Sequence, residues 1–170
     1  YCKINKSAKI QLGVATDTLD QEGEVIQTKE VPELINGADD IVLQNALDCF
    51  RGGYSQTPPM YSALKKDGQP LYKLARSGIS VERKARDIKI YSLECTNYDK
   101  KSHVLDIKVK CSKGTYIRSL ALDIAEKLGT VGHLIDLRRV SIGKFQESDM
   151  CDLNNNINNN LDINHNLDAK

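Results

Sequence analysis

The sequence predicts an α+β protein in which strands form a sheet and helices pack against it. Three segments alternate apolar and polar residues with the period of a strand, namely residues 6–13, 86–94 and 104–111. Two others, 39–51 and 116–128, repeat apolar residues at steps of three and four, as an amphipathic helix does. The chain has 170 residues, which is the length of about one domain.

The N-terminal part predicts two strands with an acidic turn between them. Ala8, Ile10 and Leu12 lie on one side of the first strand, which is typical of a half-buried strand. The turn contains Gly23, and Val25 starts a short second strand.

The first helix is bounded by recognisable start and stop residues. Either Asp39 or Asp40 can act as its N-cap, and Gly52-Gly53 is the expected stop. The positions expected to face the core are Val42, Ala46 and Phe50.

Residues 54–70 predict a long loop with a hairpin in it. Pro58 and Pro59 cannot donate backbone hydrogen bonds and stiffen the entry to the loop. The Lys-Lys-Asp-Gly sequence that follows favours a tight turn. A short helix over LYKLARSG comes next, closed by Gly78.

The clearest helix is the one at 116–128. Thr115 is its expected N-cap and Gly129 its end. The segment HLIDLRRVSIGKF, residues 133–145, predicts a turn or short helix leading into a last strand. The apolar stripe of the long helix comprises Ile117, Leu120, Ala121, Ile124 and Leu128.

Composition excludes several classes of protein. No apolar run approaches the ~20 residues of a membrane helix, and no secretory leader is visible, so neither a membrane protein nor a secreted one is expected. Five dispersed cysteines without a CxxC pair argue against a disulfide framework and a zinc site. The three histidines lie far apart and form no metal-ligand pattern. Because the cysteines are odd in number and dispersed, we expect them to be reduced, in a cytosolic compartment.

The net charge of +1 conceals two oppositely charged segments. Residues 17–48 hold nine acidic residues and one basic residue, whereas residues 51–91 hold nine basic and three acidic ones. A basic segment can contact phosphates, although an ordinary solvated surface has the same pattern.

The C-terminal end has a different composition. Eight asparagines lie between positions 154 and 166, which is typical of a disordered polar tail. We therefore expect the folded part to span residues 1–150 and the tail to span 151–170.

Arg118 occupies a position where the local electrostatics disfavour a positive charge. It lies in the first turn of a predicted helix, and the N-terminal end of a helix dipole is itself positive. This predicts an anionic partner nearby, a carboxylate or a phosphate, although a surface arginine is an alternative. Tyr116 beside it could belong to the core, cap the helix or stack on a base.

Three blocks of the sequence form a recognisable set. They are QLGVATDTLDQEGEV, FRGGYSQTPPMYSALKKDGQPLYKLARSGISVERKAR, and SKGTYIRSLALDIAEKLG with HLIDLRRVSIGKF. Together these blocks resemble TruB-type tRNA pseudouridine synthases. Their order and spacing match the catalytic domain of the family across residues 8–146. The second block points to the stand-alone type rather than to the guide-RNA-dependent relatives.

The resemblance implies a fold and a reaction. It implies a mixed, largely antiparallel sheet flanked by helices, of the pseudouridine synthase catalytic-domain type and N-terminally incomplete. It implies that a uridine in the T-arm loop of tRNA is flipped out, detached from its sugar, turned and rejoined through carbon. The family uses one catalytic Asp and neither metal nor cofactor. We expect a monomer, in the cytoplasm or in an organelle.

The resemblance also implies roles for single residues. Tyr116 matches the stacking Tyr of the family, Arg118 the Arg that pairs with the catalytic Asp, and Leu137 a Leu that packs against the base. The segment at about 54–89 resembles the RNA-contacting loop region, with Tyr61 as a stacking residue. Its phosphate-contacting candidates are Lys65, Lys66, Arg76, Arg83, Lys84 and Arg86.

The sequence departs from the family at two positions that concern the site. The catalytic Asp of the family lies in a motif resembling G-x-x-x-L-D-P-x-A-x-G, which this chain lacks. Asp20 is followed by Gln21 and belongs to another block. Arg118 is therefore expected to have no carboxylate to position, and the chain alone is expected to be inactive. An aromatic six residues before Leu12 is replaced by Lys6, unless the register shifts to Tyr1.

Three functions stay open at this stage. The first is a tRNA pseudouridine synthase of which this chain is the C-terminal part of the catalytic domain. The second is a catalytically inactive relative that binds tRNA. The third is a protein-interaction domain that uses the acidic segment 17–48 as its surface.

Overall fold

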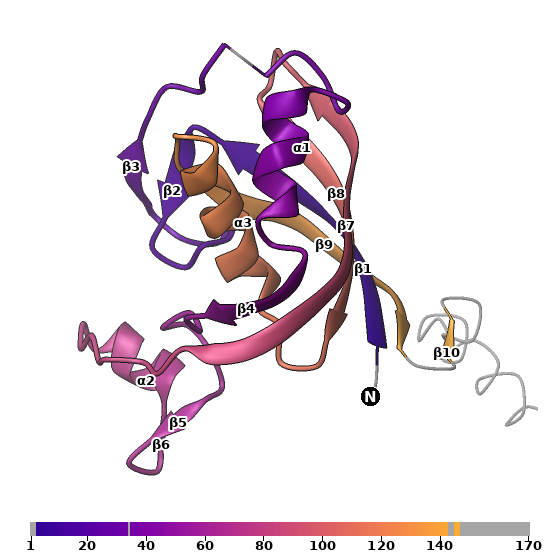
Figure 1. The fold of residues 1–170 in the computed structure, drawn as a ribbon. Helices are drawn as coiled ribbons and strands as arrows, with labels where there is room; N and C mark the ends of the chain where they lie inside the picture. Colours follow the sequence, from indigo (N-terminus) through magenta and orange to yellow (C-terminus); the bar gives the residue numbers. More distant parts are fainter. Residues whose placement is uncertain (1–2, 34, 143–144, 147–170) are drawn as a thin grey trace, which may run out of the picture.

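The computed structural model describes residues 3–33, 35–142 and 145–146. More of the described residues lie in strands than in helices, and three helices occur among them (Figure 1). The elements are β1 (Lys3–Leu12), β2 (Val14–Thr16), β3 (Val25–Thr28), α1 (Ile41–Asp48), β4 (Gly52–Gln56), β5 (Lys65–Lys66), β6 (Gln69–Pro70), α2 (Leu71–Arg76), β7 (Arg86–Asp99), β8 (Val104–Ser112), α3 (Ile117–Lys127), β9 (Gly132–Ile142) and β10 (Phe145–Gln146).

One six-stranded sheet organises the fold, with the strand order β10-β9-β1-β8-β7-β4. Every ladder in it is antiparallel, and an isolated bridge between Asp20 and Leu134 is parallel. The predicted α+β fold with a largely antiparallel sheet is therefore confirmed. Figure 1 shows α1 and α3 on the same face of this sheet, while α2 and the β5–β6 hairpin protrude beyond β4.

The core lies between the sheet and the two helices α1 and α3. Alternate residues of β1 point into it, and Ala8, Ile10 and Leu12 are all buried. This is the face that the alternation in the sequence predicts. The other strands and the helices add buried residues that include Ile90, Leu93, Leu105, Ile107, Leu43, Leu47, Leu120 and Ile124.

Helix α1 is capped as expected, and two of the three positions predicted to face the core, Ala46 and Phe50, are buried. The Asp40 carboxylate accepts a hydrogen bond from the backbone N–H of Val42, which stabilises the N-terminus. Val42, predicted to face the core, is 39% exposed, while the adjacent Leu43 is buried. The predicted stop at Gly52-Gly53 is wrong, because the helix ends at Asp48 and both glycines pair with β7 in strand β4.

Helix α3 ends as the sequence predicts and begins differently. Gly129 follows it with φ of +84°, a conformation that glycine adopts without steric cost. The prediction that Thr115 caps its N-terminus is wrong. Its hydroxyl donates instead to the carbonyl of Ser112 at 2.9 Å, and Tyr116 occupies the N-cap without a side-chain hydrogen bond.

The hairpin and the short helix of the loop region are both present. Asp67 and Gly68 connect β5 to β6 with positive φ angles of 51° and 83°, as a two-residue hairpin turn requires. Helix α2 then ends before Gly78. These small elements have few neighbours to pack against, which agrees with their protrusion in Figure 1.

The segment after Gly129 is a strand rather than a turn or short helix. Residues 132–142 form β9, which pairs with β1 over its whole length with two register shifts. The neighbouring strand supplies backbone partners to a segment whose own apolar pattern is ambiguous. The tail expected at 151–170 lies outside the described residues. In the part that the structure describes, no helix is long and apolar enough to cross a membrane.

Close packing of α3 on the sheet predicts that Gly132 cannot carry a side chain. A Cβ there would lie 2.8 Å from the Cβ of Ala125 and 2.9 Å from the carbonyl of Gln11. We expect Gly132→Ala to lower the free energy of unfolding by about 1–3 kcal/mol through overpacking. Urea denaturation measures the change, and Gly37→Ala, where a Cβ meets nothing within 4 Å, is the control. Equal stability of the two variants would contradict this packing.

Candidate functional site

Arg118 joins three parts of the chain at the start of α3. Its Nη1 donates to the carboxylate of Asp20 at 2.9 Å and to the carbonyl of Thr18 at 3.0 Å. Its Nη2 donates to the carbonyl of Tyr61. The guanidinium therefore ties the β2–β3 turn and the loop after β4 to the first turn of the helix.

The predicted anionic partner of Arg118 is confirmed, and it is Asp20. The expectation that Arg118 has no carboxylate in this chain is wrong. The side chains of both partners are about a quarter exposed, so water screens the pair only in part. The sequence predicts the acidic turn that contains Asp20, but the approach of Asp20 to Arg118, 98 residues away in sequence, depends on the tertiary fold.

The second carboxylate oxygen of Asp20 is bound within its own turn. Its Oδ1 accepts hydrogen bonds from the hydroxyl of Thr18 at 2.6 Å and from the backbone N–H of Glu22 at 3.1 Å. The turn also docks on β9, because the N–H of Leu134 donates to the carbonyl of Leu19 at 3.0 Å. One oxygen of the carboxylate thus organises its own turn while the other binds the guanidinium.

Arg118 and Leu137 line the same open pocket of about 290 Å³. Leu137 lies on β9 and is 45% exposed, so it presents an apolar surface to this pocket. The acidic side of the pocket is formed by Asp20, Glu22 and Asp136. A positioned cation, an apolar surface and a fixed carboxylate, that of Asp20, can orient a flat polar ligand.

Tyr116 is fixed through its backbone by Gln56. The Gln56 side chain accepts from the N–H of Tyr116 at 2.9 Å and donates to its carbonyl at 3.0 Å. It also donates to the hydroxyl of Tyr54 at 2.6 Å, and that hydroxyl donates to Asp123 at 3.0 Å. Burial raises the pKa of the Asp123 carboxyl. Tyr116 is not among the residues that line the pocket of Arg118.

Gln56, at 2% exposed, is a positioning residue that the sequence reasoning missed. No local pattern marks a glutamine at the end of a strand as the partner of a residue 60 positions away. Its burial is the only signal, and burial is not visible before the fold is known.

Of the seven predicted RNA-contacting residues, five line one basic pocket. They are Lys65, Lys66, Arg83, Lys84 and Arg86. Two others lie elsewhere. Arg76 stacks over the ring of Tyr72 with 5.8 Å between guanidinium carbon and ring centroid, and the hydroxyl of Tyr61 donates to Asp17 at 3.2 Å.

Lys6 occupies the position at which the resemblance implies an aromatic residue. It is the first buried residue along β1 and lies on the face of this strand that points into the core. It is 8% exposed, and its Nζ donates to the carbonyl of Thr115 at 3.3 Å. Burial lowers the pKa of its ammonium; nearby Cys111 raises this pKa and Arg139 lowers it further.

This burial predicts a pH-dependent cost of folding. Because the folded pKa lies below the unfolded value of 10.5, the cost is fully present below the folded pKa and fades as the pH rises toward 10.5. We expect Lys6→Met, measured by urea denaturation, to gain stability over the parent at pH 7 and to lose that advantage toward pH 10. Lys108→Met, on an exposed site of β8, is the control. A difference that does not vary with pH would contradict the burial of a charged Lys6.

No group of three His, Cys, Asp or Glu side chains that could hold a metal occurs among residues 3–33, 35–142 and 145–146. The free cysteines in this part of the chain include Cys49, Cys95 and Cys111. Burial raises the pKa of the Cys95 thiol to about 11, which disfavours its thiolate.

Comparison with known proteins gives matches over most of the chain. The model described as "TruB family pseudouridylate synthase (N terminal domain)" matches residues 5–117, and "tRNA pseudouridylate synthase B C-terminal domain" matches residues 118–164. Proteins named tRNA pseudouridine synthase B are similar to it. That of Francisella tularensis subsp. novicida is 55% identical over 84% of this chain and 45% of its own length. That of Francisella philomiragia is 52% identical over 87% and 47%. The chain spans about half the length of these curated relatives.

Solved structures support the same fold. A chain in the crystal structure of a Cbf5–Nop10–Gar1 complex has a TM-score of 0.54 and 26% identity, over 85% of this chain and 32% of that one. A chain in the archaeal box H/ACA sRNP Nop10–Cbf5 complex has a TM-score of 0.51 and 21% identity, over 86% and 30%.

Proposed function

Since this chain belongs to the TruB family of pseudouridylate synthases, we propose that it is part of a tRNA pseudouridine synthase. The reaction would convert a uridine in the T-arm loop of tRNA to pseudouridine. The observation that carries the proposal is the Arg118 guanidinium, fixed between Asp20 and the Tyr61 carbonyl at a pocket that Leu137 also lines.

Each side chain of this pocket suits one part of the task. A flipped-out uracil is flat and polar at its edge, so it needs an apolar wall and directed hydrogen bonds. Leu137 would supply the wall. Arg118, already immobilised by three acceptors, would orient the catalytic carboxylate at no further cost in side-chain ordering. In this proposal that carboxylate belongs to the motif of the family that this chain lacks, and Asp20 positions Arg118.

The proposal also covers the extent of the domain, the contacts to tRNA, the oligomeric state and the compartment. Residues 1–150 would be a piece of the catalytic domain, with Tyr116 as the stacking residue. The five cations of the basic pocket, together with Tyr61 and Arg76, would contact the tRNA. The protein would act as a monomer, in the cytoplasm.

The activity can be tested on the full-length protein that contains this chain. It should release tritium from tRNA carrying 5-tritiated uridine. Arg118→Ala should lower the rate by about 10²-fold or more, as the loss of a preorganised electrostatic group does, while tRNA binding changes little. Lys108→Gln, which changes an exposed residue of β8 that lines neither the pocket of Arg118 nor the basic pocket, is the matched control.

Other outcomes favour the competing functions. Salt-sensitive tRNA binding by the parent protein without tritium release would favour the inactive RNA-binding relative. Absence of tRNA affinity at low salt would favour a protein-interaction domain. Activity of Arg118→Ala within a few-fold of the parent would contradict the role of Arg118.

The salt dependence of binding tests the basic segment separately. Each phosphate contact contributes roughly 0.7–0.9 to the slope of log affinity against log salt. We expect the double variant Lys65→Gln/Lys66→Gln to reduce that slope by about 1–2 units. The double variant Lys101→Gln/Lys108→Gln has the same net charge and changes exposed lysines on β8 and the preceding turn. Equal slopes for the two double variants would contradict phosphate contacts at the hairpin.

A further inference from the structure

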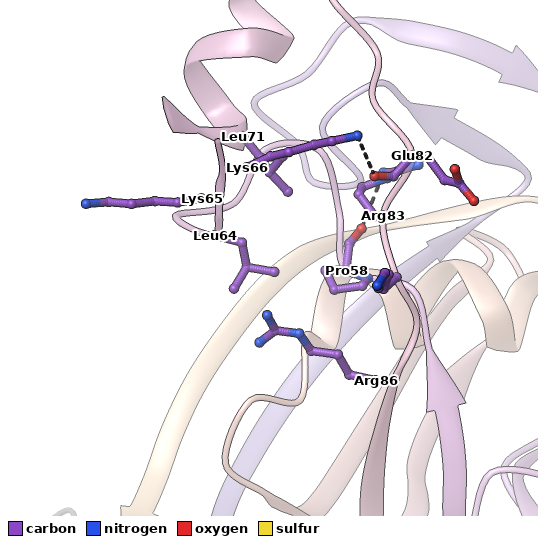
Figure 2. A pocket seen from close by; sticks show the side chains of 9 residues that line it. Pro58, Leu64, Lys65, Lys66, Leu71, Glu82, Arg83 and Arg86 are labelled. Carbon is purple, nitrogen blue, oxygen red and sulfur yellow. Dashed lines mark hydrogen bonds between the residues drawn. The ribbon is translucent and has the colours of Figure 1, made fainter. Parts of the chain in front are cut away.

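The basic pocket lies at the root of the protruding hairpin, apart from the pocket of Arg118. It has a volume of about 350 Å³, within the range of about 300–1,000 Å³ of small-molecule sites. Figure 2 shows that its side chains come from three segments, the loop after β4, the β5–α2 region and residues 82–86.

Part of the lining of this pocket is apolar. Pro58, Leu64 and Leu71 line it without offering a side-chain hydrogen-bonding group. Leu71 is 4% exposed and belongs to the packed structure, whereas Leu64 is half-buried at the surface of the pocket. A site that served phosphate alone would not need such a surface, because an inorganic anion gains nothing from apolar contacts.

Most of the remaining lining residues are basic. Five basic side chains line the pocket against the single carboxylate of Glu82. Lys66 reaches across toward Glu82, where its Nζ lies 3.5 Å from the backbone carbonyl (Figure 2). The uncompensated charge favours an anionic ligand.

Arg83 is built into the pocket and keeps an unused donor. Its Nη1 donates to the carbonyl of Pro58 at 3.3 Å, which fixes the guanidinium against the loop (Figure 2). Its Nε is buried and has no hydrogen-bond partner. A buried N–H without an acceptor is costly, so an acceptor that reached this Nε would stabilise the Arg83 side chain.

We propose that this pocket binds one unpaired nucleotide of the substrate RNA, outside the site of the reaction. The base would pack on Leu64 and Pro58, and its phosphate would take the hydrogen bonds of Arg83 and the charge of Arg86 and Lys66. This inference rests on the proposed function, because it assigns the ligand to the RNA and not to a free nucleotide of the same chemistry.

A connection between the basic pocket and the pocket of Arg118 supports RNA as the source of the bound nucleotide. A short segment, residues 57–61, bonds to both sites. The carbonyl of Pro58 accepts from Arg83, and the carbonyl of Tyr61 accepts from Arg118. The carbonyl of Thr57, which precedes Pro58, accepts from Ser119 of α3 at 3.0 Å. An RNA strand whose reacting base lies at Arg118 would therefore pass along this segment and reach the basic pocket with a neighbouring unpaired nucleotide.

Binding of mononucleotide to the full 170-residue chain tests the pocket directly. The probes are uridine 5′-monophosphate, uridine and inorganic phosphate, titrated at low salt while the methyl NMR signals of Leu64 and Leu71 are followed. We expect the nucleotide to bind about tenfold or more tighter than either half alone. Arg83→Gln and Arg83→Lys should each weaken it by about tenfold, since lysine keeps the charge but not the fork of donors. Leu64→Ser should weaken it too, and Lys108→Gln should not, with circular dichroism confirming that each variant folds.

The source is tested by competition with a T-arm RNA hairpin. Displacement of the mononucleotide from the Leu64 signal supports the proposal, whereas simultaneous binding would assign the pocket to a free nucleotide and overturn it. Equal affinity for phosphate and nucleotide, or binding that the Arg83 variants leave unchanged, would also overturn it. Tritium release by the full-length protein is measured separately. Release without nucleotide binding sinks only this inference, and displacement by RNA without release sinks only the proposed activity.

Discussion

The hydrogen-bonding capacity of one guanidinium is the constraint around which the site is organised. Arg118 lies in the first turn of α3, where the helix dipole disfavours a cation, and this cost is offset by three acceptors from two other segments. Removal of any acceptor would leave a partly buried positive charge less well satisfied. The β2–β3 turn and the loop after β4 are therefore held where they are by the same side chain.

The positions of Arg118 and of Leu137 both depend on the sheet. Helix α3 can approach β1 and β9 closely because Gly132 has no side chain between Ala125 and Gln11. Strand β9 in turn carries Leu137 into the pocket and binds the β2–β3 turn through Leu134. The position of the apolar wall relative to Arg118 thus follows from the packing of one helix on two strands.

Sequence patterns predicted the features that depend on interactions between neighbouring residues. The alternation of Ala8, Ile10 and Leu12 predicted a strand and its buried face, and the helix cap was narrowed to Asp39 or Asp40, because both effects act within a few residues. The predictions failed where a distant segment competes. Thr115 has the side chain of a cap but bonds to Ser112, and Gly52-Gly53 enters a strand because β7 offers backbone partners there. The strand at 132–142 has the same explanation, since β1 pairs with it.

The sequence by itself determined which residues are candidates for the chemistry. The resemblance of its three blocks to one family named Arg118, Leu137 and the basic segment, and the electrostatics of a helix terminus required an anion beside Arg118. Only the tertiary structure decided which anion that is. Asp20 belongs to a turn 98 residues away, and no local pattern measures the distance between two such side chains. The same holds for Gln56 and for the buried Nε of Arg83. Burial and hydrogen-bond satisfaction are properties of the packed chain, so they arise only when segments distant in sequence come into contact.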